Sequence, residues 1–541
     1  MKKSVKFLLA VVSGLLMAFS WPMKGIPVLI LFAFVPLLFV ENEQRKNKSS
    51  NTPYGIFWYA FLTFLIFNGL TTYWIYNAAL AAGIFAVVFT TLLMTLTFQL
   101  FHVTARNFDS NGASYTSFIA LWLCYEFIQL RWDLNWPWMN LGNAFGMWPS
   151  WIQWYDITGV FGGTLWILMV NILIFTAAKK FLDSSNKKVP VKETVFSLGL
   201  IVVPVIYSQI RYATYEEKSN PVNVVVVQPN IDPYNEQYDL DPMVVTRKMI
   251  DMAISQCDSA TDFIICPESA IQEYIFEDQF NTSPSINKFR EIKKQFPKMR
   301  SVVGLSSRKI FSENEPLTAT ARKFRDADKY YDAYNTAMLI DSDSSLQVHH
   351  KSKLTPGVER MPYPKFFKFL EKYALDLGGT IGSLGIDEEQ IPFKTAGGTT
   401  IAPVICYESA FGEFTSKFVA NGANVIFVIT NDGWWKDTPG HRQHMVFSAV
   451  RAIETRRSVA RSANTGFSCL VNQRGNISQR TGYWVPAVIK GTINANDKIT
   501  FFVKYGDYIG RAGVFTAILF LLLTLVNILR KKTISVQSKT K

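Results

Sequence analysis

The chain has 541 residues, a formal net charge of +13 and apolar residues at 49% of its positions. These apolar residues are concentrated in the first 210 positions and near the C-terminus, which excludes an ordinary soluble protein and favours a membrane protein. The basic residues stand at the ends of apolar stretches, so the charge does not indicate nucleic-acid binding. Five cysteines without a CxxC pair exclude a recognisable disulfide framework or zinc site.

The N-terminal part divides into seven apolar stretches, which predict a membrane domain of seven transmembrane helices over 1–215. The stretches cover roughly 7–22, 25–40, 55–76, 78–102, 114–130, 160–178 and 193–210. The first begins like a secretory signal peptide, but a second follows at once, which favours an uncleaved helix. An eighth stretch, 512–529, predicts a last transmembrane helix over 510–531 and a cytoplasmic tail over 532–541.

The charges between these stretches predict the topology. With a cytoplasmic N-terminus, the short loops on the outer side hold only Lys24 and Arg131. The cytoplasmic side then receives Lys2, Lys3, Lys6, Arg45, Lys46, Lys48, Arg106, Lys179, Lys180, Lys187, Lys188, Lys192, Arg530, Lys531, Lys532, Lys539 and Lys541. Because seven spans precede it, the domain at 220–505 is expected outside the cytoplasm.

Tryptophan is abundant in the outer loop 131–159. This loop is either an interfacial aromatic belt or a partly inserted segment that shapes a lipid-facing entrance to the outer domain. Trp138 and Trp148 of this loop, with Trp434 and Trp435 of the outer domain, are the candidates for that entrance.

The outer domain reads as short buried strands that alternate with helices, which predicts an α/β layer fold. Strands are expected over 223–230, 262–269, 301–307, 335–341, 346–354, 399–406 and 424–432, and helices after Asp241 and over 443–458. The domain has no dinucleotide fingerprint, phosphate-binding loop or GxSxG elbow.

Three reactive side chains are predicted at or just past strand ends, where α/β folds place their chemistry. Glu268 is a candidate general base, Lys351 a candidate oxyanion donor and Cys406 a candidate nucleophile, and together they make an acyl-transfer set. Each also has a purely structural interpretation. Glu268 would be a carboxylate at a helix N-terminus, Lys351 a solvated charge at a strand end and Cys406 a small buried hydrophobe. The spacing of these residues alone does not decide between the catalytic and the structural interpretation.

The surroundings of these residues resemble the nitrilase superfamily, whose members use Glu, Lys and Cys in that chain order. The matching segments are "SNPVNVVVVQPNI", "CPES", "HHKSKLTPGVERMP", "PVICYES" and "RSANTGFS". Eight spans around such a domain, together with "NWPWMNLGNAFG" and "QHMVFSAVRAIETRRSVARSANTG", resemble the apolipoprotein N-acyltransferase family of bacterial membranes.

The resemblance implies a nitrilase-like αββα sandwich inserted before the last transmembrane helix. It implies transfer of a fatty acyl chain from a membrane phospholipid, through a thioester on Cys406, to the N-terminal amine of a diacylglyceryl-cysteine lipoprotein. Glu268 would be the proton acceptor, Lys351 the oxyanion stabiliser and the backbone N–H of Tyr407 a second donor. The enzyme would be a monomer of the bacterial inner membrane, with a periplasmic catalytic domain and neither cofactor nor metal.

The Lys motif departs from the family pattern, because "TPGVE" stands where "VPFGE" is usual. Glu359 keeps its offset and is expected to support Lys351 and Cys406. Lys353 is the rival for the catalytic lysine, since residues two apart on a strand share a face. Glu408 is expected to hold the incoming amine or the turn at Cys406, or to be a structural carboxylate.

Further interpretations remain open. His441 and His444 have metal-ligand spacing but no evident third ligand, so they are expected to cap or pack the following helix. A membrane-tethered nitrilase-type amidase of small amides would share the same three residues. A non-catalytic membrane receptor or transporter is the alternative of another class, and Glu126 is the one candidate for a buried charge in its spans.

Overall fold

The structure is a computed structural model that describes residues 1–22, 25–46, 54–78, 80–341, 346–363 and 383–539. It consists of two compact units. A helical unit comprises 1–76, 80–211 and 507–541, and an α/β unit comprises 77–79 and 212–506.

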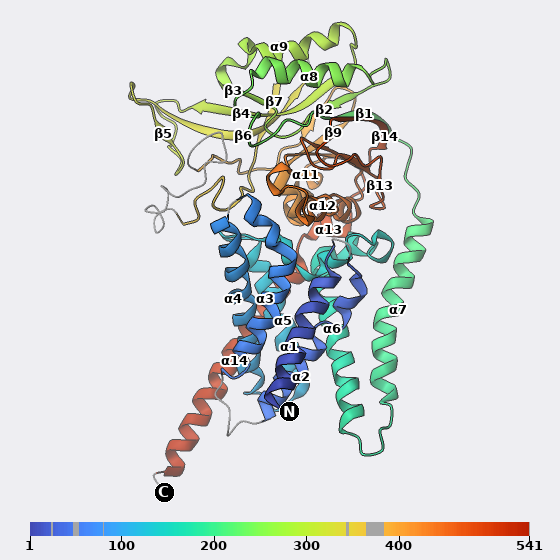
Figure 1. Cartoon of the computed structure of the whole chain (residues 1–541), viewed down its shortest axis with the longest axis vertical. Helices are drawn as coiled ribbons and strands as arrows, with labels where there is room; N and C mark the ends of the chain where they lie inside the picture. The colour runs from blue at the N-terminus through green and yellow to red at the C-terminus, as the bar shows by residue number, and fades with distance from the viewer. Residues whose placement is uncertain (23–24, 47–53, 79, 342–345, 364–382, 540–541) are drawn as a thin grey trace. The chain divides into compact units, whose positions relative to one another are not determined.

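The helical unit is a bundle of long apolar helices (Figure 1). Its helices are α1 (Lys3–Ser20), α2 (Val35–Lys46), α3 (Phe57–Thr72), α4 (Leu80–Ala105), α5 (Asn111–Gln129), α6 (Tyr155–Asp183), α7 (Val191–Thr214) and α14 (Tyr508–Lys539).

Six segments among the described residues are long and apolar enough to cross a membrane: Lys3–Ser20, Pro27–Lys46, Leu80–Ala105, Tyr155–Asp183, Val191–Thr214 and Tyr508–Lys531. The protein is therefore a multi-pass membrane protein. The predicted third and fifth spans form α3 and α5, which are not among these six, so the eight-span arrangement stays a prediction.

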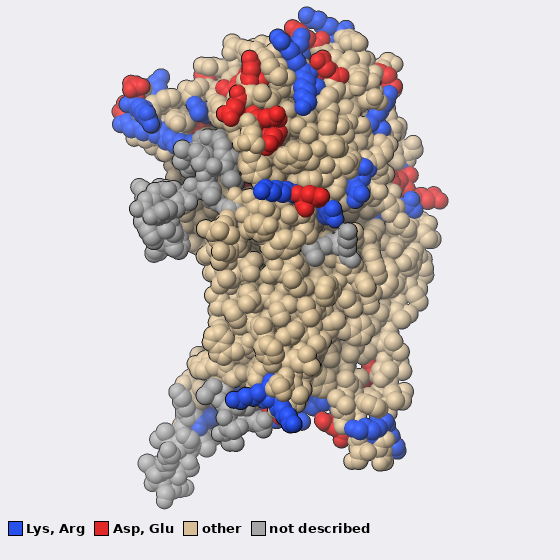
Figure 2. Space-filling model, viewed as in Figure 1, with Lys and Arg blue, Asp and Glu red and all other residues tan. Residues whose placement is uncertain are grey.

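Basic side chains gather at one end of the helical unit. Lys179 of α6 donates a hydrogen bond to Asn42 of α2 at 2.9 Å, and Lys531 of α14 donates to Asn107, just past α4, at 3.3 Å. Figure 2 shows Lys and Arg at the lower end of this unit, below a broad band without charged side chains. The helix ends that the topology prediction assigns to one side thus meet in space, while the side of the membrane they face stays a prediction. Lys24, Lys48 and Lys541, which that prediction also used, lie outside the described residues.

Glu126 anchors the tryptophan-rich loop to the helices. Its carboxylate accepts hydrogen bonds from the backbone N–H of Leu141 at 2.8 Å, from Thr164 at 2.7 Å and from Trp122 at 3.1 Å. A carboxylate with three donors has a structural use, and this weakens the transporter alternative.

One further buried carboxylate in the helical unit was not foreseen. Glu41 of α2 lies 2.9 Å from His102 of α4 and 3.5 Å from Arg45. It stands at the end of the unit where the basic residues gather.

The α/β unit contains two sheets. The first has the order β14-β1-β2-β4-β6-β5, with β3 on β4 and β7 on β6, and the second has the order β13-β12-β11-β10-β9-β8. The first sheet's strands are β1 (Pro221–Gln228), β2 (Phe263–Ile265), β3 (Ile271–Phe276), β4 (Arg300–Ile310), β5 (Arg322–Lys323), β6 (Tyr330–Ile340), β7 (Leu346–His350) and β14 (Ala487–Asn494). Those of the second are β8 (Phe393–Lys394), β9 (Thr400–Ile405), β10 (Val425–Thr430), β11 (Val459–Ala463), β12 (Cys469–Val471) and β13 (Ile477–Ser478).

The sheets pack face to face, and helices cover them in Figure 1, so the unit is an αββα sandwich. Alternate residues of β1 face opposite sides: Val224 and Val226 enter the core with Phe427 of the second sheet, whereas Val225 packs toward Met249 of α8 (Pro242–Ile254). The other covering helices are α9 (Pro284–Glu291), α11 (Gly412–Ala420) and α12 (Pro439–Thr455). The predicted α/β fold is confirmed. Asp241 caps α8 as expected, accepting a hydrogen bond from the N–H of Met243 at 2.8 Å.

Candidate active site

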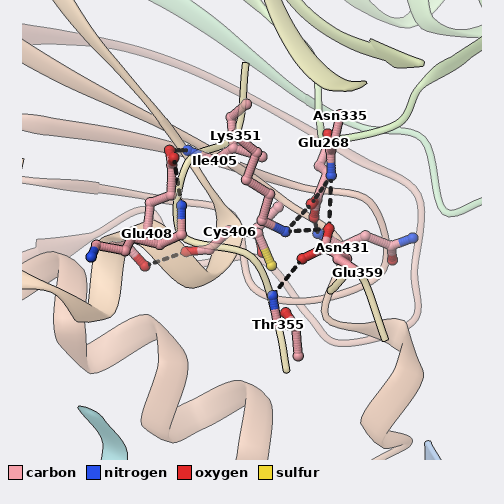
Figure 3. Close-up of polar contacts among 12 residues, drawn as sticks. Glu268, Asn335, Lys351, Thr355, Glu359, Ile405, Cys406, Glu408 and Asn431 are labelled. Carbon is pink, nitrogen blue, oxygen red and sulfur yellow. Dashed lines mark hydrogen bonds and ion pairs between the residues drawn. The ribbon is translucent and has the colours of Figure 1, made fainter. Parts of the chain in front are cut away.

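The three predicted reactive residues each follow the end of a strand. Glu268 comes three residues after β2, Lys351 directly after β7 and Cys406 directly after β9. The sandwich brings these strand ends together, and Figure 3 shows the thiol of Cys406 beside the amine of Lys351, with Glu268 on the other side of that amine.

Glu268 is held in place by donors on three segments. Its Oε1 accepts hydrogen bonds from Lys351 at 2.9 Å and from Asn335 at 2.8 Å, and its Oε2 accepts one from the backbone N–H of Asn431 at 2.9 Å. Gly304 of β4 packs directly against this turn, where a Cβ would lie 2.6 Å from the Cα of Glu268. The carboxylate therefore has a fixed orientation before any substrate arrives.

Lys351 lies between two carboxylates and is 2% exposed. It donates to Glu268 at 2.9 Å and to Glu359 at 2.8 Å. Burial alone would lower the pKa of Lys351, but the charges of Glu268 and Glu359 outweigh it and raise the pKa well above its ordinary value. The ammonium has three hydrogens, and the described contacts use two, so the third is available for a developing oxyanion.

Lys353 is placed differently from Lys351. Because β7 ends at His350, the two lysines do not share a regular strand face. The ammonium of Lys353 lies 5.1 Å from the ring centre of Phe411 and 6.0 Å from that of Phe414. Of the two lysines, Lys351 is the one bound to Glu268.

Cys406 occupies a strained turn. Its φ of 49° is in the left-handed region, which a side chain adopts at a cost of about 1–3 kcal/mol. Burial and the charge of Glu268 raise the pKa of the Cys406 thiol above its ordinary value, and Lys351 offsets them only in part. The thiol is therefore neutral at rest, and its proton needs a base.

The altered Lys motif still brings Glu359 to the site. The loop closes on itself, because Gly357 donates to the carbonyl of Arg360 at 2.8 Å and Thr355 donates to Oε2 of Glu359 at 2.9 Å. Gly357 has a φ of 79°, which glycine adopts without strain. A different residue order thus preserves the contact between Glu359 and Lys351.

Glu408 connects the nucleophile turn to the lysine strand. It is completely buried and accepts hydrogen bonds from the backbone N–H groups of Ile405 at 2.8 Å and Ser352 at 2.6 Å. Of the roles considered from sequence, these contacts fit the one in which Glu408 holds the turn. The neighbouring Tyr407 is buried, and its ring packs edge-on against Phe411 at 5.2 Å.

A second polar cluster lies behind Cys406. The ligand atoms of Cys406, Asp432 and His444 lie within 4.8 Å of one another, the one metal-compatible group found among the described residues. Asp432, however, binds Arg461 at 2.7 Å, and Arg461 also lies 3.1 Å from Nδ1 of His444. This permanent positive charge disfavours a metal cation, and the absence of a metal stays a prediction. His444 also lies 3.0 Å from the carbonyl oxygen of Cys406, so it supports the turn.

The four lipid-entrance candidates lie in both units. Trp434 and Trp435 are half-buried in the α/β unit, and Trp435 packs edge-on against His444 at 5.5 Å. In the helical unit Trp148 is half-buried, whereas Trp138 is buried and stacks on Trp136 at 5.4 Å. Their role in lipid entry stays a prediction.

The polar residues that surround and orient the three reactive groups were not predicted from the sequence. They are Asn335, Asn431, Asp432, Arg461, His349, His350, Asp387 and Glu277. The adjacent pair His349 and His350, directly before Lys351, was the one local signal for them. The others come from distant segments, and only the fold brings them to the site.

Comparisons with known proteins match both the N-terminal part and the α/β part of the chain. Residues 13–173 match the family model of the apolipoprotein N-acyltransferase N-terminal domain, and residues 223–499, about half of the chain, match that of the carbon-nitrogen hydrolases. The chain belongs to the apolipoprotein N-acyltransferase family.

Relatives in this family match along nearly the whole chain. The apolipoprotein N-acyltransferase of Chlorobaculum tepidum is 28% identical, with 94% of this chain and 96% of the relative covered. That of Geobacter metallireducens is 27% identical, with 93% of this chain and 92% of the relative covered. Among solved structures, Saccharomyces cerevisiae Nit3, a member of branch 10 of the nitrilase superfamily, aligns with a TM-score of 0.36 and 17% identity over 52% of this chain and 92% of its own.

Membership of the apolipoprotein N-acyltransferase family fixes the class of the protein. It is an N-acyltransferase of the nitrilase superfamily with a multi-pass membrane part. The family predicted from the sequence is thereby confirmed.

Proposed function

We propose that the protein moves a fatty acyl chain from a membrane phospholipid to the N-terminal amine of a diacylglyceryl-cysteine lipoprotein, by way of a thioester on Cys406. The observation that carries the proposal is the Glu268–Lys351 pair beside the Cys406 thiol, in a chain of this family. The other supporting residues are Glu359, Tyr407 and Glu408.

In the first half-reaction Glu268 takes the thiol proton as the sulfur attacks the ester carbonyl of the phospholipid. The free N–H of Lys351 and the backbone N–H of Tyr407 stabilise the tetrahedral oxyanion. The carbon–oxygen bond then breaks, Glu268 returns the proton to the departing lysophospholipid alkoxide, and the acyl group remains on sulfur. A thiol held neutral by burial makes this base necessary.

In the second half-reaction the lipoprotein amine attacks the thioester carbonyl. Glu268 accepts the amine proton, the carbon–sulfur bond breaks, and the thiol is regenerated with that proton. The products are the N-acylated lipoprotein and the enzyme in its starting state. This site needs no cofactor for either step. We place the reaction at the outer face of the bacterial inner membrane and propose a monomer.

The membrane-tethered amidase remains the second candidate, because it would use the same Glu268, Lys351 and Cys406. Mass spectrometry of the intact protein, purified directly from membranes, separates the two. We expect a fraction of the protein to carry one fatty acyl group that neutral hydroxylamine removes. Protein that never carries an acyl group, even after incubation with phospholipid, would contradict the proposal.

A further inference from the structure

A chain of five titratable side chains runs through the α/β unit beside Lys351, and none of the reaction steps above uses it. In order of contact its members are Glu408, His349, Asp387, His350 and Glu277. His349 and His350 are the last two residues of β7, and both are buried.

Each histidine ring lies between two carboxylates. His349 places Nε2 at 3.2 Å from Glu408 and Nδ1 at 3.2 Å from Asp387. His350 places Nδ1 at 2.7 Å from Asp387 and Nε2 at 2.7 Å from Glu277. A carboxylate oxygen only accepts hydrogen bonds, and a neutral imidazole has a single N–H. Donation to two carboxylates therefore requires both rings to be imidazolium ions.

The aromatic neighbours of the two rings carry no charge. The ring of His349 packs edge-on against Phe418 of α11 at 5.1 Å, and His350 stacks on Tyr334 of β6 at 3.9 Å. Burial raises the pKa of Tyr334, so it is a neutral phenol. Two cations lie in the surroundings: Lys351, which directly follows His350 and binds Glu268 and Glu359, and Lys309 of β4, whose charge lowers the pKa of Glu277.

The pKa values agree with this geometry. Burial alone would lower the pKa of His349, but Glu408 and Asp387 raise it to about 9. For His350 the hydrogen bonds to Asp387 and Glu277 likewise outweigh burial and raise the pKa to about 9.

Two carboxylates of this chain, Glu408 and Asp387, hold the backbone on either side of the reacting groups. Glu408 binds the N–H of Ile405, which precedes Cys406, and the N–H of Ser352, which follows Lys351. Asp387 binds the N–H of His350, which precedes Lys351, at 2.8 Å. The carboxylates that flank His349 thus fix the position of the lysine relative to the thiol.

We propose that His349 and His350 are positioning residues, which act as a pair of imidazolium ions that join Glu408, Asp387 and Glu277 and so hold Lys351 against the Cys406 turn. This inference rests on the proposed function only for the roles of Lys351 and Cys406.

The raised pKa values of His349 and His350 determine how their contribution to stability changes with pH. A group whose pKa is about 9 in the folded protein and about 6.5 when unfolded contributes fully below pH 6.5. Its contribution is lost as the pH rises through 9. Alkaline pH should therefore loosen the contact between the lysine strand and the turn.

The first test is the rate at which iodoacetamide alkylates Cys406 in full-length His349→Gln, compared with wild type from pH 6 to 10. Glutamine keeps a hydrogen-bonding side chain and removes the charge. We expect wild type to react about 10²-fold faster at pH 7, since a misplacement of about 1 Å has an effect of that order. The ratio should approach one above pH 9, where wild type has also lost the charge. A ratio that does not change with pH would overturn the proposal, because a role in packing alone predicts that result.

His441→Gln is the matched control. His441 is also completely buried and stacks on Tyr483 at 4.1 Å, but burial lowers its pKa to about 4, so it is neutral throughout the assay. Its alkylation rate should stay near that of wild type at every pH. If Cys406 is alkylated as slowly in His441→Gln as in His349→Gln, any buried histidine has the same effect, and the proposal fails.

The second test needs no variant and covers the case in which His349→Gln does not fold. The chain has five histidines, so histidine-labelled wild type gives five imidazole signals by NMR. We expect two of them to keep imidazolium shifts up to about pH 9. If all five signals titrate at or below pH 6.5, the proposal is wrong. Neither test uses a lipid substrate, so each outcome is independent of whether the acyl-transfer proposal holds.

Discussion

Glu268 and Lys351 form a buried ion pair whose two members have separate tasks in the proposed chemistry. Glu268 moves protons, whereas Lys351 supplies a hydrogen to the oxyanion. Lys351 also binds Glu359 at 2.8 Å, and Glu268 also accepts hydrogen bonds from Asn335 and from the N–H of Asn431, so the loss of either single charge leaves the other with partners. Substitutions here should therefore separate chemistry from folding.

Glu268→Gln tests the base. The amide is isosteric and Lys351 keeps Glu359, so the variant is expected to fold and insert normally. It cannot take the thiol proton, and we expect acylation of Cys406 to fall by about 10²–10⁴-fold. Single-turnover transfer from labelled phospholipid measures this rate. Acylation near the wild-type rate would remove Glu268 from the mechanism.

A comparison of the two lysines tests the oxyanion donor. Lys351→Met should reduce acylation by about 10²–10³-fold, because it removes a donor aimed at the developing charge. Lys353→Met should have a mild effect, because that ammonium lies over Phe411 and not on Glu268. The same single-turnover assay ranks the two variants, and the reverse ranking would show that the catalytic lysine has been misassigned.

At the level of strands and turns, β4 determines where Glu268 sits. A Cβ on Gly304 would lie 2.6 Å from both the Cα of Glu268 and the carbonyl oxygen of Pro267, so the turn would have to move. Gly304→Ala is expected to slow acylation by about 10–10²-fold, as a misplaced base would. Gly397→Ala is the control, because its new Cβ would meet no atom closer than 3.9 Å. Equal rates in the two variants would show that the close packing does not position the base.

The sequence predicted the strands of the sandwich well, because buried strands are continuous apolar runs with turn formers at their ends. It was less successful where an element ends. The expected strand 346–354 stops at His350, and this early end separates Lys351 from Lys353. The positive φ of Cys406 also has no local signal, since the residue is not glycine.

The orienting residues of the site could not be predicted for a related reason. Asp387 and Glu277 reach His350 across 37 and 73 residues of chain, and Asn431 reaches Glu268 across 163. Such contacts depend on how two sheets pack, which no local pattern encodes. The three candidate reactive residues could be singled out because each lies within three residues of the end of a recognisable strand.

For the whole molecule, the charge distribution predicts which side of the membrane each unit faces. A reporter active only outside the cytoplasm should be active when fused after residue 215 and silent when fused at residue 185. The physical reason is that basic residues collect at one end of the helical unit, and loops rich in Lys and Arg stay in the cytoplasm. The reverse pattern of activity would refute the outward placement of the α/β unit.

The central claim for the whole molecule is that Cys406 carries the acyl group between two substrates. Wild type, incubated with acyl-labelled phospholipid and no lipoprotein, should bind the label covalently and release it to neutral hydroxylamine. Cys406→Ser should bind none, although the small change in volume leaves it folded and inserted. Cys266→Ser is the matched control, because Cys266 is completely buried in the core between the first sheet and its helices and should label like wild type. Label that persists in Cys406→Ser, or that never attaches to wild type, would contradict the thioester mechanism.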